Sequence, residues 1–199
     1  MTEIEPYYLL EKFYSKILPG KVLDIGCGPG SNSVFLARQN FEVLAIDINQ
    51  KYIEKLNNFA KKEFINLTAK KENIRNFKFD ESYSSILAIN CLQFLKKSER
   101  DTVIKKIKTS LKKGGIIFIS AFTIQDNSYK NLSKKNKPIE ENTFYSKKPE
   151  GYWSFFNLGE LKSYFAKEFK ILQYNEKLIN DAHPIPHQHG IAEIVAQKK

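Results

Sequence analysis

A short segment near the start of the chain combines acidic side chains with closely spaced glycines. Residues 21–25 predict a short apolar strand that contains Asp24, and this strand runs directly into Gly26-Cys27-Gly28-Pro29-Gly30. Such a turn lets the backbone approach a ligand closely, and the N-terminus of the helix after it favours anionic groups. Asp47 ends the next strand, so in a doubly wound sheet it would lie beside the turn and could accept hydrogen bonds from both ribose hydroxyls. The segment predicts a nucleoside site.

The same residues indicate which nucleoside would bind. The dinucleotide fingerprint requires a third glycine where this chain has Ser31, and no lysine of the P-loop type follows the glycines. A carboxylate at Asp24 would repel a pyrophosphate, whereas it would attract the ammonium and sulfonium of a methionine-type ligand. The pattern therefore favours a sulfonium nucleoside over a phosphorylated one.

All three histidines of the chain lie in one stretch, at His183, His187 and His189. The last two would share one face of a strand, where a histidine could take a proton from an acceptor or orient it. Exposed loop histidines are the simpler alternative. Three imidazoles could also ligate zinc. However, no cysteine or acidic side chain lies between the first and the last of them and two prolines interrupt the run, so we expect no metal site.

The remaining pattern supplies the elements that must position these residues. Strands are predicted at 21–25, 42–46, 64–69, 83–89 and 116–122, with helices over 5–17, after the glycine turn, over 50–62 and over 98–111. Two late strands, 169–175 and 190–197, fit an antiparallel hairpin at the sheet edge. We expect a doubly wound, mainly parallel seven-stranded α/β sheet with helices on both faces. The run 116–122 suits a strand buried on both sides.

A polar, lysine-rich stretch over 123–152 interrupts the alternation. Long irregular stretches in a compact domain are usually lids or disordered loops, so we expect one domain over 1–199 with 123–156 as a lid or insertion. Asn157 and Glu160 predict a capping box that opens a helix. Trp153 ends the stretch and could close over an apolar acceptor, although at least half of such aromatic residues are simply core.

Composition limits the function classes. The chain has 199 residues, 42% of them hydrophobic, which suits a single core. Its two cysteines form no disulfide framework, and the first residues lack the apolar region of a signal peptide. We expect a cytoplasmic protein without a membrane segment. The net charge of +10 comes almost wholly from scattered lysines, which favours a solvated surface over a nucleic-acid patch.

Residues 20–120 resemble class I S-adenosylmethionine (SAM)-dependent methyltransferases. The resemblance depends on the glycine turn, on Asp24 and Asp47, and on the order and spacing of the predicted strands. The resemblance implies a Rossmann-like fold, SAM as the cofactor and S-adenosylhomocysteine as its product. It implies that Asp24 and the turn hold the amino-acid end of SAM and that Asp47 binds its ribose. It also implies that Ile48 and Ile74 enclose the adenine, whereas Asn90 and Cys91 lie near the methyl group. Asn73 stands where the family often has Asp, and its carbonyl can accept from the adenine amino group. The implied cofactor residues are Asp24, Gly26, Cys27, Gly28, Gly30, Asn32, Asp47, Ile48, Asn73, Ile74, Asn90 and Cys91.

A narrower resemblance links Gly30-Ser31-Asn32-Ser33 and Leu158-Gly159-Glu160-Leu161 to the tellurite-resistance methyltransferase group, a relative of the thiopurine enzymes. Ser31 stands where that group can carry arginine, and the chain has no arginine after Arg100, so no oxyanion-binding arginine is transferred. The resemblance implies methyl transfer to a small molecule, such as a thiol or a tellurium or selenium oxyanion. An oxygen or nitrogen acceptor would need a base, for which His187 or His189 would serve.

Other functions stay open at this point. They are an RNA or protein methyltransferase, a non-catalytic SAM-binding protein, and a nicotinamide oxidoreductase, against which Asp24 argues. The glycine turn could also merely pack a strand on a helix. Cys27 and Cys91 could form a nucleophile pair, but small uncharged residues beside a sulfonium are the preferred interpretation. We expect a small-molecule acceptor and a monomer or homodimer, with nucleic acid an unlikely partner.

Overall fold

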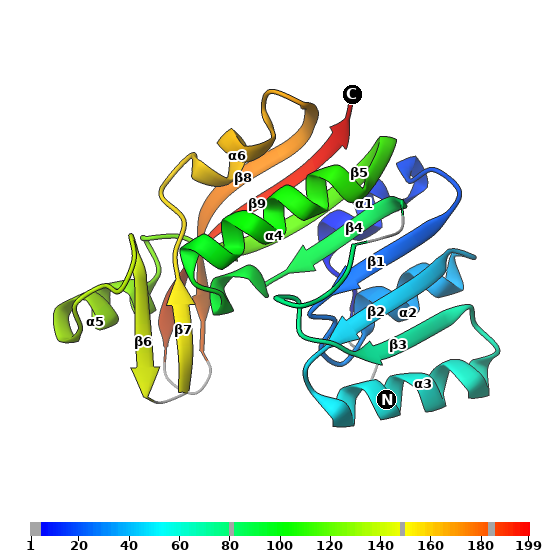
Figure 1. Ribbon diagram of the computed structural model, residues 1–199, viewed down its shortest axis with the longest axis horizontal. Coiled ribbons are helices and arrows are strands. Elements are labelled where there is room, and N and C mark those ends of the chain that lie inside the picture. The colour runs from blue at the N-terminus through cyan, green and yellow to red at the C-terminus, as the bar shows by residue number, and fades with distance from the viewer. Residues whose placement is uncertain (1–4, 80–81, 148–149, 183–185) are drawn as a thin grey trace.

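A computed structural model describes residues 5–79, 82–147, 150–182 and 186–199, and its centre is a seven-stranded sheet (Figure 1). The strand order is β3-β2-β1-β4-β5-β9-β8. Strands β1 to β5 run parallel, and β9 is antiparallel to both of its neighbours. The strands are β1 (Lys21–Ile25), β2 (Glu42–Asp47), β3 (Leu67–Lys71), β4 (Tyr83–Ile89), β5 (Leu111–Phe122), β8 (Phe169–Asp181) and β9 (His187–Lys198).

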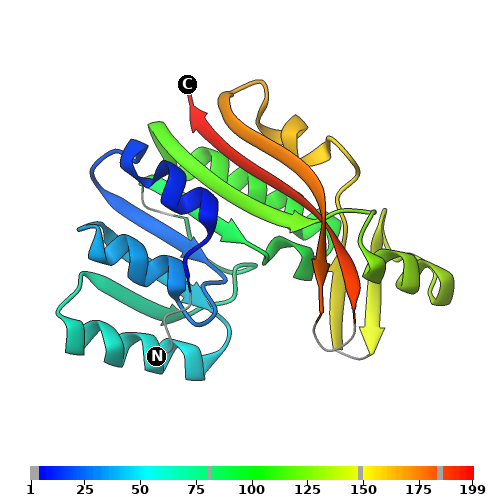
Figure 2. The same ribbon diagram turned by 180° about the vertical axis from the view of Figure 1, so that it is seen from behind.

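Helices cover both faces of the sheet, as Figures 1 and 2 show from opposite sides. One face carries α1 (Tyr8–Phe13), α2 (Ser31–Arg38) and α3 (Gln50–Glu63), and the other carries α4 (Lys97–Ser110) and α6 (Glu160–Phe165). The four residues 116–119 of β5 are completely buried, because the sheet is covered on both sides. The doubly wound fold is confirmed. Chain order reverses between β1 and β4, which is where ligands bind in such sheets.

The C-terminal hairpin is longer than predicted. β8 continues to Asp181 and β9 already begins at His187, and these two residues are paired in register. The additional pairs include exposed ones such as Asn180 with Gln188, which also share a side-chain hydrogen bond of 3.0 Å. Since both faces of this extension are partly solvated, its residues lack the apolar pattern on which the prediction depended. The extension carries the histidines beyond the edge of the main sheet.

The prediction that 123–152 is irregular was wrong. The segment contains α5 (Asn127–Lys135) and a two-stranded antiparallel sheet of β6 (Thr143–Lys147) and β7 (Glu150–Ser154). Phe144 and Phe155 are buried there, and the ring of Tyr129 contacts both. This small aromatic core explains why a polar, lysine-rich segment is ordered. In Figure 1 the three elements stand beside the far end of the β8–β9 hairpin.

Three predicted boundaries near helices were also wrong. The first helix ends at Phe13 and a 3₁₀ turn, η1 (Tyr14–Lys16), follows it. The third strand begins at Leu67 because Phe64 ends α3 in the left-handed region, with φ of 53°. The helix predicted from Asn157 begins at Glu160 behind Gly159. Only half of the predicted capping box forms, in which the Asn157 amide donates to the Glu160 carboxylate at 2.7 Å.

Candidate active site

The glycine turn connects β1 to α2 and brings the end of β4 against it. Gly26 has φ of +65°, and a Cβ at this position would lie 2.6 Å from the Cβ of Cys91. Only glycine therefore allows the residue after β4 to approach this closely. Gly28, with φ of +53°, has no atom within 4 Å of the place where a Cβ would stand, so its outer side faces open space. The turn is closed toward β4 and open toward a ligand.

Asp47, at the end of β2, is hydrogen-bonded to this turn. Its Oδ2 accepts from the Gly28 amide at 2.9 Å, and its Oδ1 accepts from the Asn49 amide at 2.8 Å. Each carboxylate oxygen keeps a second lone pair that can accept from a hydroxyl. The next side chain, Ile48, is 67% exposed. A fixed carboxylate beside an uncovered apolar side chain suits a ribose with a flat base attached to it.

Asp24 lies beneath the turn rather than on its surface. Its side chain is 1% exposed, and its Oδ2 accepts from the Ser33 hydroxyl at 2.5 Å. Burial raises the pKa of this carboxyl to about 6; the Ser33 hydrogen bond opposes the rise and the charge of Asp47 adds to it. A buried carboxylate with one neutral donor gains from a cation placed nearby.

The loops after β3 and β4 complete this edge. The side-chain oxygen of Asn73 accepts from the Arg75 amide at 3.0 Å, and Ile74 is partly buried against the core. Asn90 has φ of 50° and its side-chain oxygen accepts from the Ser120 hydroxyl at 2.6 Å, which joins the ends of β4 and β5. The short 3₁₀ turn η2 (Leu92–Phe94) follows.

Both thiols on this edge are poor nucleophiles. Burial raises the pKa of the Cys27 and Cys91 thiols far above the usual range, and the charges of Asp24 and Asp47 add to the effect. A thiol that stays protonated does not form a covalent intermediate readily. This supports the interpretation of both cysteines as small uncharged wall residues.

Asn32 makes a contact that the sequence did not predict. Its side-chain oxygen accepts from the Tyr7 amide at 2.8 Å, which places the start of α1 across the N-terminus of α2. The Tyr7 hydroxyl then donates to Glu193 at 2.8 Å, and the Tyr8 hydroxyl donates to the same carboxylate at 2.6 Å. Glu193 is 2% exposed and also pairs with Lys177 at 2.8 Å. Sequence reasoning missed Glu193 because its two tyrosine partners lie more than 180 residues away.

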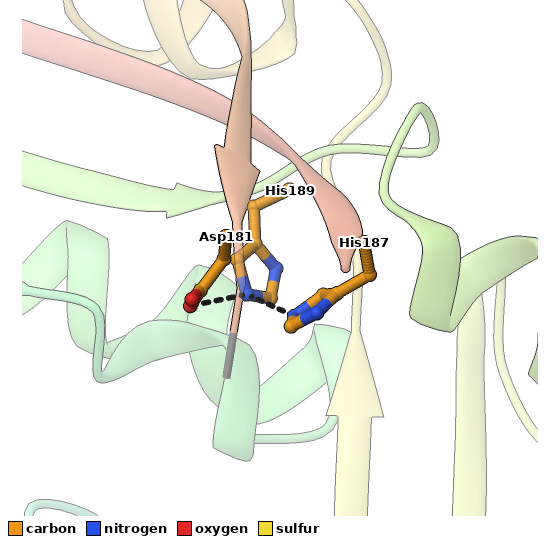
Figure 3. A group of neighbouring side chains, drawn as sticks. All are labelled: Asp181, His187 and His189. Atoms are coloured by element: carbon orange, nitrogen blue, oxygen red, sulfur yellow. Dashed lines mark hydrogen bonds and ion pairs between the residues drawn. The ribbon is translucent and has the colours of Figure 1, made fainter. Parts of the chain in front are cut away.

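His189, near the start of β9, contacts a buried acid that sequence reasoning also missed, and Figure 3 shows His189 beside His187. His189 Nδ1 lies 2.8 Å from Asp126 Oδ2, and its Nε2 lies 2.9 Å from His187 Nε2. Asp126 is completely buried and caps α5 through the Ser128 amide. An Asp-x-Ser sequence at a helix start was the available signal. His183 lies outside the described residues.

A row of rings runs from these histidines toward the ends of β4 and β5. The His189 ring stacks on Phe122 at 4.8 Å between centroids, and Phe122 stacks on Trp153 at 6.3 Å. Trp153 meets Phe94 edge to face at 5.1 Å. Phe122 is two residues after Ser120, which bonds to Asn90. The row therefore joins the histidines to the edge that carries the glycine turn.

The arrangement defines the class of protein. A doubly wound sheet with an antiparallel final strand between β5 and β8, a glycine turn after β1 and an acid after β2 is that of the class I SAM-dependent methyltransferases. Comparison with known proteins narrows the class. A family model described as tellurite resistance protein TehB matches residues 12–188, and the chain belongs to this family.

Individual relatives agree. A protein of Haemophilus influenzae named "Probable S-adenosyl-L-methionine-dependent methyltransferase TehB" is 30% identical over 162 residues, which cover 81% of this chain and 50% of that protein. The crystal structure of TehB from Haemophilus influenzae has a TM-score of 0.77 at 26% identity and covers all of this chain and 64% of its own. A SAM-dependent methyltransferase from Methanosarcina mazei has a TM-score of 0.76 at 25% identity, covering 98% and 99%. The chain spans about half the length of the first curated relatives that it matches.

None of the helices formed by the described residues is long and apolar enough to cross a membrane.

Proposed function

We propose that the protein transfers the methyl group of SAM to a small-molecule acceptor. The observation that carries this proposal is the convergence of two features on one edge of the sheet. The open glycine turn with Asp47 lies at the ends of β1 and β2, and the aromatic row with the histidines begins at the ends of β4 and β5. The proposed donor site and the proposed acceptor site would thereby be neighbours.

The residues of the turn fit SAM. The open side of Gly28 leaves room for the ligand, the free lone pairs of Asp47 suit the ribose hydroxyls, and the exposed Ile48 suits one face of the adenine. Buried Asp24 would attract the ammonium group through the turn. Asn73 and Ile74 would bound the adenine from the next loop, and Asn90 and Cys91 would line the methyl side. Asn32 would act by holding the N-terminal segment over the turn.

In the transfer, a lone pair of the acceptor attacks the methyl carbon, and the carbon–sulfur bond breaks with its electron pair returning to the sulfonium sulfur. S-adenosylhomocysteine and the methylated acceptor result. The protein contributes alignment and exclusion of water, and no covalent intermediate is required. Any proton lost by the acceptor must leave on its side of the site.

The acceptor is proposed to be a soft one, such as a thiol or a tellurium or selenium oxyanion, because such acceptors need little help from a base. His187 and His189 are the groups proposed to contact it, either by orienting it or by taking its proton. His183 is proposed with them on the sequence alone. The rings of Phe122 and Trp153 would cover the acceptor, and segment 123–156 would serve as its lid.

Two measurements test the proposal. Calorimetry should show binding of S-adenosylhomocysteine and none of NAD, and a panel of thiols and of tellurium and selenium oxyanions should include a methylated product. Binding without any transfer would favour a non-catalytic SAM-binding protein. Methyl transfer to RNA or protein alone would contradict a small-molecule acceptor and would identify an RNA or protein methyltransferase.

The proposed lid role of segment 123–156 leads to a separate prediction for Trp153. Trp153→Ala should raise the KM for the acceptor about 10-fold or more, since it removes a stacked ring and an edge contact, while the affinity for S-adenosylhomocysteine stays unchanged. Tyr152→Ala is the matched control, because Tyr152 lies on the same strand but packs on Tyr145 and Lys96 instead. Equal acceptor kinetics in both variants would rule out the lid role of Trp153.

A further inference from the structure

Three side chains of the C-terminal hairpin point their ligand atoms at one place (Figure 3). Atoms of Asp181, His187 and His189 that could bind a metal all lie within 4.8 Å of one another. His187 Nε2 and His189 Nε2 are 2.9 Å apart, and Asp181 Oδ2 is 3.7 Å from His189 Nε2. Strand pairing produces this convergence, because Asp181 is opposite His187 in register and His189 lies two residues further along the same face.

The orientation of His189 leaves one nitrogen for a ligand. Asp126 accepts at Nδ1, so the proton of the neutral ring is assigned to Nδ1 and the lone pair to Nε2. That lone pair faces the second imidazole and the Asp181 carboxylate. Two imidazole nitrogens and a carboxylate oxygen are a donor set that binds divalent transition metals.

The surroundings hold His189 in this orientation. Asp126 is completely buried and its other oxygen is occupied by the Ser128 amide, so the carboxylate is fixed. A Cβ at Gly190 would lie 2.6 Å from the Asp126 nitrogen, so glycine allows β9 to pass this close. Phe122 stacks on the imidazole with an angle of 6° between the planes. A buried carboxylate on the far nitrogen of a histidine is the usual support of a metal ligand.

We propose that Asp181, His187 and His189 bind one divalent transition-metal ion of the zinc type. Three protein ligands leave at least one coordination position open, as in catalytic zinc sites. If the proposed methyl transfer is correct, on which this role rests, the open position would take the thiolate or oxyanion of the acceptor. The sequence argument against a metal depended on the interrupting prolines and on the lack of an acidic partner, and it overlooked Asp181, which strand pairing places opposite His187.

Cobalt titration tests the site directly. Protein without a histidine tag, freed of metal by a chelator, should bind one equivalent of Co²⁺ with a visible absorption band that Zn²⁺ removes. His187→Ala, His189→Ala and Asp181→Asn should each abolish the band. Asp126→Asn should weaken Co²⁺ binding about 10- to 100-fold, the usual cost of losing such a supporting carboxylate. Gln188→Ala is the control and should bind as the parent does, since its side chain bonds to Asn180.

The same samples separate this proposal from the proposed function. Each variant is also tested for a cooperative thermal transition and for binding of S-adenosylhomocysteine, neither of which needs the metal. Cobalt binding without S-adenosylhomocysteine binding would uphold the metal site and overturn the methyltransferase proposal. Folded protein that binds no Co²⁺, or binds it equally well without His187 and His189, would overturn the metal site and leave the two imidazoles as a pair that shares a proton.

Discussion

Asp24→Asn is expected to stabilise the unliganded protein at pH 8 and to weaken its binding of S-adenosylhomocysteine. Burial raises the pKa of Asp24 from 3.8 to about 6, so the ionised form is unfavourable inside the folded protein. At pH values above the pKa of Asp24 in both the folded and the unfolded state, this shift corresponds to roughly 3 kcal/mol. That figure is an upper bound for the stability that the asparagine variant gains. Ser33 can still donate to the new amide oxygen. Loss of the charge opposite the ligand's ammonium should cost about 10- to 100-fold in affinity.

The pH dependence of the stability gained by Asp24→Asn identifies the cause of that gain. A carboxyl whose pKa is raised in the folded state binds its proton more tightly there than in the unfolded chain. The contribution of Asp24 to the stability of the parent protein therefore falls as pH rises from about 4 to about 6, and the asparagine variant lacks this contribution. Urea unfolding at pH 4 and pH 8 should show a difference between the two proteins only at the higher pH. Unchanged ligand affinity in the variant would show that Asp24 does not select the cationic ligand.

Asp47→Ala is expected to lower the affinity for S-adenosylhomocysteine by at least about 100-fold. Two hydrogen bonds from ribose hydroxyls to a carboxylate are together worth about 3–6 kcal/mol. The substitution also frees the Gly28 and Asn49 amides, which the carboxylate now holds. Asp47→Asn keeps one acceptor oxygen and should lose less. Glu54→Gln, an exposed change on α3, is the control and should bind normally.

A ligand without the ribose hydroxyls isolates their contribution to the binding affinity. The parent protein should bind S-adenosylhomocysteine much more tightly than its 2′,3′-dideoxy analogue, and Asp47→Ala should bind both equally. Equal preference in the parent and the variant would contradict the assignment of Asp47 to the ribose, whatever the overall loss of affinity.

Local patterns were sufficient to predict the parallel part of the fold. The runs that form β1, β4 and the part of β5 over residues 116–122 are short and largely apolar, and turns or helices with a 3.6-residue pattern separate them, so each run is specified by its own neighbours. The first five residues of β5, 111–115, contain two lysines and two glycines and were not predicted as strand. The glycine turn and Asp47 were found for the same reason, because both follow strands that can be predicted individually. The doubly wound order then places them together.

Features that depend on distant residues could not be predicted. Asp126 and His189 are 63 residues apart, and neither side chain has a local signal for the other. Glu193 is acidic in an apolar strand, and the hydrogen bonds from Tyr7 and Tyr8 together with the ion pair to Lys177 stabilise it there. Segment 123–156 has a polar composition, and its order comes from Phe144 and Phe155 packing together with Tyr129.

The position of β9 has a consequence for the order in which the protein can assemble. This strand lies between β5 and β8, although it follows both of them along the chain. Within the described sheet, β8 pairs with β9 alone, so it has no place in the sheet until the final twelve-residue strand arrives. Until then β5 is an open, apolar edge. The part of the sheet that carries the glycine turn can thus be complete while the hairpin that carries His187 and His189 has yet to form.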